Sequence, residues 1–244
     1  GMGEPCDWFE VSFIYYSSQL PKLQTACSFR ATHDGAIVFS GVIDEYSISI
    51  DEKGSVVTLS GRSKAALLLD NELPSQEYPA LGSAAAVASF VSPYGINSVI
   101  AGSSVTLSAF SVRTGESASS ALKRFCRYAW ETTPYFTKDG TLILNGRSGD
   151  TITVDASKDV SSIAMCDERY GIISDISVRN RVTGASYTSS NTAFAARGGK
   201  CHREMTVPKT TGADAVRYTA AYQIAESQRC KKCVKLTLTK QFAC

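Results

Sequence analysis

The chain has 244 residues, of which 43% are apolar and 20% charged, a composition typical of globular proteins and not of disordered chains. It contains no run of about 18 apolar residues, so no membrane insertion is expected, and no signal peptide is visible. The net charge of +2 conceals an asymmetry, because residues 1–178 carry 13 basic and 20 acidic side chains whereas residues 179–244 carry 12 and 3. Such a basic segment can face an acidic partner, an acidic neighbouring subunit, nucleic acid or only solvent.

Eight cysteines are scattered along a chain that is too long to need a disulfide framework. They are Cys6, Cys27, Cys126, Cys166, Cys201, Cys230, Cys233 and Cys244. Without a secretion signal, we expect reduced thiols and synthesis in a cytoplasm. Cys126 falls on the apolar face of an expected helix, which predicts a small buried core residue.

Residues 6–80 are expected to form a first β-rich domain. Apolar and polar side chains alternate over Val11–Tyr15 and again over Tyr46–Ile50, the period of strands that bury one face. Two turn sequences, His33-Asp34-Gly35 and Asp51-Glu52-Lys53-Gly54, separate stretches of this kind. They predict β-hairpins.

This first domain is expected to end shortly after a strand-to-helix junction. Gly61-Arg62-Ser63-Lys64 closes the last strand and leads into a short apolar segment that ends at Asp70. Pro74 and Pro79 lie in a polar stretch and mark the boundary of the domain.

Residues 82–150 are expected to form a compact α/β unit. Ser83–Val91 has helical spacing, and a second helix is predicted with Thr114 as its cap and Glu116 near its positive N-terminal end. An apolar stripe on this second helix comprises Ala118, Leu122, Phe125 and Ala129. Tyr135–Leu144 contains an Asp-Gly turn and predicts a hairpin.

Strands are expected to resume over residues 151–244. Ile172–Val178 alternates as a strand does, and residues 184–203, rich in Gly, Ser and Ala, predict a long mobile loop. A last helix is predicted over Gly212–Arg229, followed by a strand over Val234–Leu238. One face of this helix carries Val216, Ala220 and Ile224.

Catalytic motifs are absent from the sequence. It contains no G-x-S-x-G, P-loop, G-x-G-x-x-G or H-E-x-x-H pattern, and its histidines are His33, in an expected turn, and His202. Asp44-Glu45 and Asp51-Glu52 are the nearest approach to the carboxylate pair of a hydrolase. Adjacent acids on a strand point to opposite faces, however, and acids around a turn are usually solvated.

A zinc site is the sharper chemical alternative. Cys230-Lys-Lys-Cys233 has the spacing of a zinc knuckle, and Cys201-His202 could complete four ligands, which would make the chain a small zinc-dependent binding module. The second pair is contiguous rather than spaced, and no βαβ context favours redox chemistry. The basic residues after 179 form no recognition helix or aromatic platform that would indicate sequence-specific nucleic-acid binding.

Short motifs follow one another along the chain in an order typical of one architecture. They are Phe-x-Gly-x-Ile-Asp (Phe39–Asp44), Gly-Arg-Ser-Lys (Gly61–Lys64), Leu-x-Asp (Leu68–Asp70), Tyr-Gly-Ile (Tyr94–Ile96), Gly-Glu-Ser (Gly115–Ser117), the Asp139-Gly140 turn and a late helix from about Ala213. In this order the chain resembles the baseplate hub protein of contractile-tailed phages, the family of Mu-like tail proteins and late-control protein D. The resemblance covers roughly residues 8–240.

The resemblance implies a mainly β fold with α+β elements. Two β-barrel-like tube domains, residues 6–80 and 151–244, would flank the small α/β domain of residues 82–150, and the second barrel can be incomplete at its C-terminal end. Such hubs are not enzymes and need no cofactor. They form homotrimeric rings in the virion tail baseplate, made in the cytoplasm of the bacterial host. The ring joins the tail tube to the central spike and lets DNA pass through its lumen.

The charge asymmetry acquires a structural role within such a ring. The basic region 179–244 would meet the acidic remainder of a neighbouring subunit, with Arg179, Arg181 and Lys235 as the interaction residues. The competing hypotheses are the zinc-dependent binding module and an uncharacterised hydrolase.

Overall fold

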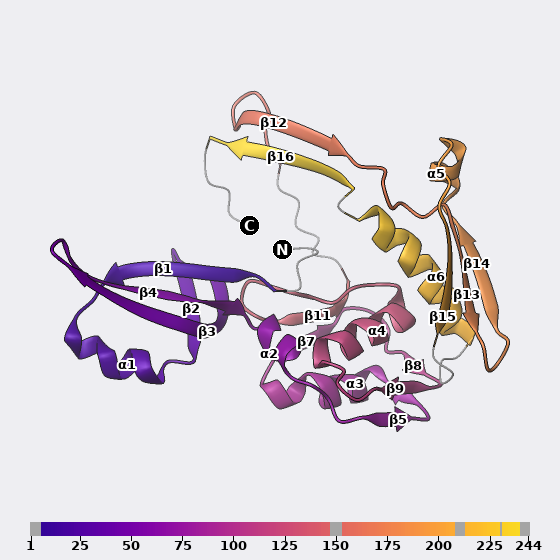
Figure 1. Ribbon diagram of the computed structural model, residues 1–244, viewed down its shortest axis with the longest axis horizontal. Coiled ribbons are helices and arrows are strands. Elements are labelled where there is room, and N and C mark those ends of the chain that lie inside the picture. Colours follow the sequence, from indigo (N-terminus) through magenta and orange to yellow (C-terminus); the bar gives the residue numbers. More distant parts are fainter. Residues whose placement is uncertain (1–5, 147–152, 208–212, 230, 240–244) are drawn as a thin grey trace. The chain divides into compact units, whose positions relative to one another are not determined.

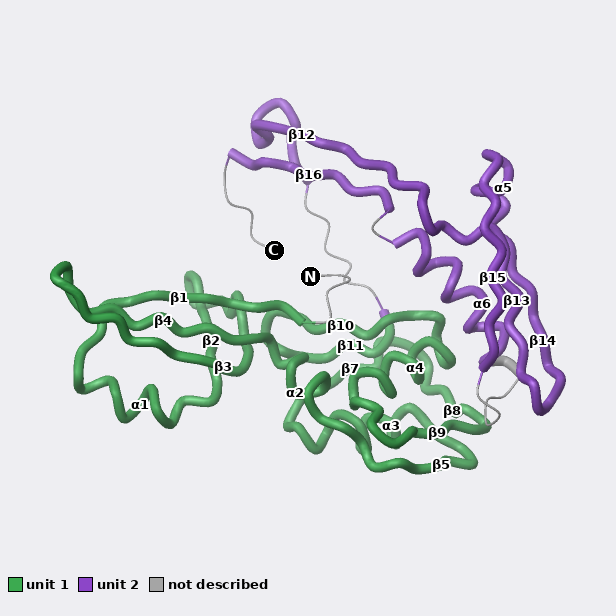
Figure 2. Tube along the Cα trace, in the orientation of Figure 1, with its two compact units in different colours: residues 1–145 green, residues 146–244 purple. Residues whose placement is uncertain are grey.

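The computed structural model describes residues 6–146, 153–207, 213–229 and 231–239. The chain divides into two compact units, a first unit that ends at Asn145 and a second that begins at Gly146 (Figure 2). Both units consist mainly of strands with helices between them (Figure 1). No helix in the described ranges is long and apolar enough to cross a membrane.

The first unit begins with an antiparallel four-stranded sheet in the order β1-β4-β3-β2. Its strands and the helices that follow β1 are β1 (Trp8–Ile14), η1 (Ser17–Gln19), α1 (Leu20–Thr25), β2 (Ser28–His33), β3 (Ala36–Asp51) and β4 (Gly54–Ser63). Between β2 and β3, Asp34 and Gly35 have φ angles of 49° and 78°. Aspartate and glycine tolerate such left-handed angles, and a two-residue hairpin turn requires them. The predicted hairpins are confirmed.

Aromatic and branched side chains form the core on one face of this sheet. The buried members are Phe9, Leu23, Val57 and Leu59. The rings of Phe9 and Phe29 are stacked with their centroids 4.1 Å apart. The predicted alternation is confirmed for Val11, Tyr15, Tyr46 and Ile48, which pack against this core. Phe13 is instead 38% exposed, and Ile50 is 72% exposed because it lies at the hairpin end beyond the core.

Strands β3 and β4 approach one another closely where β4 leads into α2 (Ala65–Asp70). A Cβ atom on Gly61 would lie 2.1 Å from the carbonyl oxygen of Val42, so only glycine fits there. The next residue, Arg62, donates from Nε to Asp44 on β3 (2.8 Å) and from Nη2 to Asp70 at the end of α2 (2.7 Å). The guanidinium lowers the pKa of Asp70. The predicted strand-to-helix junction at Gly61–Lys64 is confirmed.

The rest of the first unit is a mixed α/β region built from short strands around two helices. After α2, its elements are β5 (Gln76–Tyr78), β6 (Leu81–Gly82), α3 (Ser83–Phe90), η2 (Ser92–Tyr94), β7 (Ser98–Ile100), β8 (Thr106–Leu107), β9 (Phe110–Val112), α4 (Ala118–Trp130), β10 (Tyr135–Phe136) and β11 (Leu142–Asn145). Both predicted helices and the hairpin before residue 145 are confirmed. Strand β11 also pairs with β7 in parallel, which local sequence did not indicate.

Helix α4 supplies much of the core of this region. Its predicted stripe is buried, and the thiol of Cys126 is fully enclosed, so that burial raises its pKa. The predicted cap is wrong, because Ser117 and not Thr114 is the N-cap and accepts a hydrogen bond from the amide of Ser120 (3.2 Å). Glu116 instead forms a largely buried ion pair with Arg124 (2.8 Å).

The second unit contains a three-stranded sheet, in the order β14-β13-β15, and a two-stranded sheet of β12 and β16. Its elements are β12 (Val160–Asp167), β13 (Asp175–Asn180), β14 (Ser186–Ser190), α5 (Thr192–Ala196), β15 (His202–Val207), α6 (Ala213–Gln228) and β16 (Lys232–Leu238). Helix α6 packs against β13 and β14. The predicted last helix and last strand are confirmed.

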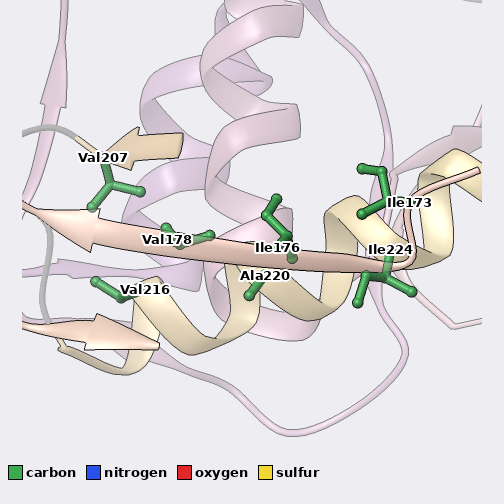
Figure 3. Packing of buried hydrophobic residues seen from close by; sticks show 7 residues of the cluster. All are labelled: Ile173, Ile176, Val178, Val207, Val216, Ala220 and Ile224. Carbon is green, nitrogen blue, oxygen red and sulfur yellow. The ribbon is translucent and has the colours of Figure 1, made fainter. Parts of the chain in front are cut away.

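A small apolar core lies between α6 and one face of the three-stranded sheet (Figure 3). Its buried members are Ile173, Ile176, Val178, Val207, Val216, Ala220 and Ile224. The predicted helix face is therefore the buried one, and full burial of each isoleucine or valine contributes about 1.5–3 kcal/mol. Strand β13 begins at Asp175, three residues later than the alternation predicts.

The predicted mobile loop over residues 184–203 is wrong. This segment contains β14, α5 and the start of β15. Strand β14 reads Ser-Tyr-Thr-Ser-Ser and shows no apolar alternation, because it is an edge strand held by antiparallel backbone pairing with β13. The composition of this segment therefore did not indicate strand β14.

The expected closed barrels are not found in the described residues. The four-stranded sheet ends in the edge strands β1 and β2, and the sheets of the second unit have three and two strands. A barrel closes only when its first and last strands pair, and so few strands cannot curl far enough to do so. The division into domains at residues 80 and 150 stays a prediction.

The close approach of β3 and β4 predicts different outcomes for two Gly→Ala substitutions. Gly61→Ala forces a methyl group against the backbone of β3, and we expect a loss of about 1–3 kcal/mol in the free energy of unfolding. Gly82→Ala is the control, because its added Cβ would meet only Thr106 Oγ1 at 3.4 Å, and we expect a loss below about 1 kcal/mol. Urea denaturation measures both, and equal losses would contradict the packing argument.

Candidate assembly surface

Strands β12 and β16 form an antiparallel ribbon that is exposed on both faces. Every residue of β16 is exposed, as is every residue of β12 except the half-buried Val160. An isolated pair of strands is only marginally stable in water. In the described residues, neither strand pairs with a third.

One face of this ribbon is apolar. The register places Ile163 opposite Leu236 and Met165 opposite Val234, and directly opposite residues point to the same face. These four side chains are 41–80% exposed. We call this the apolar ribbon face, and it also includes Val160 and Leu238. Contiguous apolar side chains are thus exposed to solvent on one face of the ribbon.

The other face of the ribbon is polar and carries three cross-strand pairs. They are Ser162 with Thr237, Ala164 with Lys235, and Cys166 with Cys233. The hydroxyls of Ser162 and Thr237 are hydrogen bonded at 2.8 Å. Strand β12 was not predicted by name, although the alternation of Ile163 and Met165 with small or polar residues is the signal that could have found it.

The face of the three-stranded sheet that points away from α6 is polar. Ser177 and Arg179 on β13 alternate with the buried Ile176 and Val178, so they lie on this outer face. The hydroxyl of Ser177 is 3.1 Å from that of Thr188 on β14. This face is therefore suited to a hydrated or charged contact rather than to an apolar one.

A charged cluster at one end of this outer face was missed in the sequence. His202 Nδ1 is hydrogen bonded to Asp175 Oδ1, and its Nε2 lies 3.7 Å from Glu204 Oε1. Asp175 raises the pKa of His202, with a smaller contribution from Glu204, and His202 lowers the pKa of Asp175. The parallel pairing of β13 with β15 brings these residues together, which no local pattern indicates.

The serine beside this cluster, Ser174, is not oriented as a nucleophile with His202 as its base. The Ser174 hydroxyl donates to Asp175 Oδ2 (2.8 Å) and accepts from the amide of Cys201 (2.7 Å), so it does not point its proton at His202. A base within hydrogen-bond reach of the nucleophile is what nucleophilic catalysis requires. The geometry instead fixes the start of β15 against β13.

The residues expected to make charged contacts lie on different elements. Arg179 is exposed on the outer face of β13, Arg181 is exposed in the turn that follows, and Lys235 is exposed on the polar face of the ribbon. Arg179 and Lys235 thus belong to separate sheets. None of the three forms an ion pair with a described carboxylate. Their role in binding stays a prediction.

The predicted zinc ligands are not gathered into one described site. His202 is the first residue of β15 and Cys201 precedes it, whereas Cys233 lies on β16 opposite Cys166. Cys230 lies outside the described residues. Within the described ranges, no three His, Cys, Asp or Glu side chains are grouped as a metal site would need.

The carboxylates considered for a hydrolase have structural partners. Asp44 binds Arg62, and Asp51 Oδ1 accepts a hydrogen bond from the amide of Lys53 in the hairpin turn (2.8 Å). Both neighbours in sequence, Glu45 and Glu52, are exposed. These acids therefore stabilise β3 and its turn.

Solved structures of phage and prophage tail proteins are similar to this chain in fold. A tail protein from Neisseria meningitidis MC58 aligns with a TM-score of 0.75 and 18% identity, over 97% of this chain and 72% of its own. The 43 kDa tail protein of prophage MuSo2 from Shewanella oneidensis aligns with a TM-score of 0.68 and 16% identity, over 96% of this chain and 73% of its own. Prophage tail protein gp18 from Listeria monocytogenes EGD-e aligns with a TM-score of 0.50 and 8% identity, over 87% of this chain and 69% of its own. No protein-family model matches the sequence, and a comparison with curated proteins finds no match.

The ion pair of Asp175 with His202 predicts a pH-dependent contribution to stability. The raised pKa of His202 means that the pair stabilises the folded chain at lower pH and is lost as pH rises through that pKa. The lowered pKa of Asp175 means that the contribution is also lost as pH falls through the pKa of Asp175. The pair therefore stabilises the folded chain at pH values between the pKa of Asp175 and the pKa of His202.

Asp175→Asn is expected to lower the pKa of His202 towards its ordinary value, because the anion that favours the imidazolium is removed. An NMR titration of the His202 ring measures this change. Glu204→Gln is the matched control and should produce a smaller decrease, since Glu204 is the more distant carboxylate. The same pKa in Asp175→Asn and in the unaltered chain would refute the assignment.

Proposed function

We propose that the chain is a structural component of a phage tail. The observation that carries this proposal is the likeness in fold to two tail proteins over 97% and 96% of the chain. The exposed apolar ribbon face is what a subunit of a larger assembly would have, because a neighbour would remove it from water.

In its finer form the proposal is a baseplate hub. Three copies form a ring that joins the tail tube to the central spike, and DNA passes through the lumen. The order of the sequence motifs supports this assignment. The chain acts in the virion tail baseplate, after synthesis in the cytoplasm of the bacterial host, and performs no catalysis.

In such a ring, the unpaired strand edges of the second unit could contact a neighbouring copy. Strands β12 and β16 each have an edge without a strand partner among the described residues. Exposed edges favour pairing with another chain unless they are covered. We therefore assign the apolar ribbon face to the contact with a neighbouring copy, whose strands would complete the barrel wall that one chain leaves open.

Charge supports the same arrangement. Residues 1–145 carry 10 basic and 14 acidic side chains, and residues 146–244 carry 15 and 9. The two units of one chain thus have opposite net charge. In a ring, the basic second unit of one copy would attract the acidic first unit of the next, which favours a head-to-tail contact and suppresses contact between like units.

The apolar ribbon face is tested by two adjacent substitutions. Leu236→Lys places a charge on that face, whereas Thr237→Lys places the same charge on the opposite face. The contact would lose the apolar area of Leu236 and would have to bury an unpaired ammonium group, so Leu236→Lys should weaken self-association by about tenfold or more. Sedimentation equilibrium of the full chain measures the dissociation constant.

Thr237→Lys should not weaken association, because it leaves the apolar ribbon face intact and adds a charge of the same sign as that of Lys235 on the polar face. Both side chains are exposed in the single chain, so neither change should unfold it. Equal weakening by the two substitutions, or none by Leu236→Lys, would argue against this face as the contact.

The charged contacts are tested by reversal of Arg179, Arg181 and Lys235. The triple variant Arg179→Glu, Arg181→Glu, Lys235→Glu should associate more weakly, and the unaltered chain should lose association as salt is raised from 50 to about 500 mM. Arg197→Glu reverses a charge at another exposed position of the same unit and should weaken association less than the triple variant does. A dissociation constant that changes neither with salt nor with the triple reversal would contradict a charged contact at these positions.

A further inference from the structure

Two free cysteines face each other across the ribbon. The register places Cys166 on β12 directly opposite Cys233 on β16, and both are exposed and reduced. They share the polar face with Lys235, opposite the apolar ribbon face. The sequence pattern had paired Cys233 with Cys230, three residues away, but the fold gives Cys233 a partner from a distant strand.

The spacing of paired strands suits a disulfide at this position. Opposite residues of an antiparallel pair have Cα atoms about 4.5 or 5.5 Å apart, and disulfides span about 4.4–6.8 Å. The Cβ atoms of such residues are about 4.5–5.5 Å apart, somewhat more than the 3.5–4.5 Å of a disulfide. A small closing movement is therefore enough to join the two sulfurs.

The register beside the cysteines is fixed by a further pair of residues. The amide of Glu168 donates to the carbonyl oxygen of Lys231 at 2.7 Å, and Lys231 Nζ lies 2.9 Å from Glu168 Oε1. These contacts lie two residues beyond the cysteines on both strands. They oppose a slip of one strand along the other, which would carry one thiol to the opposite face.

We propose that Cys166 and Cys233 form a thiol–disulfide site that clamps the ribbon when it reacts with a low-molecular-weight disulfide such as oxidised glutathione. The thiolate of one cysteine attacks the oxidant and releases one thiol as a mixed disulfide forms. The second cysteine then attacks the mixed disulfide, joins the two strands and releases the second thiol. Two protein thiols are oxidised and one disulfide oxidant is reduced to two thiols.

The disulfide would link β12 covalently to β16. The chain between the cysteines contains β13, β14, α5, β15 and α6. Closing so long a loop restricts the unfolded chain, which raises the temperature of unfolding. Because the Cβ atoms must draw together and the site is exposed, the bond should be readily reduced again.

The test is peptide mapping of the folded full chain after treatment with oxidised glutathione and alkylation of the remaining thiols. Trypsin cleaves after Lys231 and Lys232, which places Cys230 and Cys233 on separate peptides. We expect an intramolecular link between the Cys166 and Cys233 peptides. We also expect a rise of roughly 5–10 °C in the Tm that dithiothreitol reverses.

Cys230→Ser and Cys27→Ser are the controls and should retain the link and the rise in Tm, whereas Cys166→Ser and Cys233→Ser should lose both. All of these variants can be compared in the reduced state, so a folding defect is recognised before oxidation. A predominant link between Cys230 and Cys233, a link between two chains, or glutathione adducts without a Cys166–Cys233 link would overturn the proposal.

Discussion

An antiparallel pair of strands cannot remove an apolar face from water by itself, and this constraint governs how the second unit can be used. Ile163, Met165, Val234 and Leu236 line one face of β12–β16, and no described element covers them. Each carries transfer free energy that the single chain leaves unrealised. A neighbouring copy is the occupant that we assign to this face, and the proposed ring follows from that assignment.

Other parts of the described chain bury apolar cores of their own. Helix α6 covers one face of the three-stranded sheet, and α4 closes the α/β region of the first unit around Cys126 and its neighbours. Polar surfaces are also organised, with Asp175 and His202 fixing β15 against β13. The apolar ribbon face differs from these packed faces, because its side chains have no cover among the described residues.

Local patterns predicted the elements that depend on local forces. Apolar periodicity identified α4 and α6, and Asp34-Gly35 identified a hairpin because its left-handed φ angles need such residues. Patterns failed where distant backbone pairing decides the structure, as in the edge strand β14, the parallel contact that joins Asp175 to His202, and the pairing of Cys166 with Cys233. The predicted closed barrels were wrong for the described residues, because alternation shows that a strand buries one face but not how many strands join its sheet, and the sheets here have four strands or fewer.

We propose that the apolar ribbon face is buried between copies of this chain. Cryo-electron microscopy of the concentrated full chain tests it most directly. We expect a closed ring of three copies around a central opening, with β12–β16 of each copy packed against its neighbour. An ordered assembly in which Ile163 and Leu236 remain in solvent would contradict it.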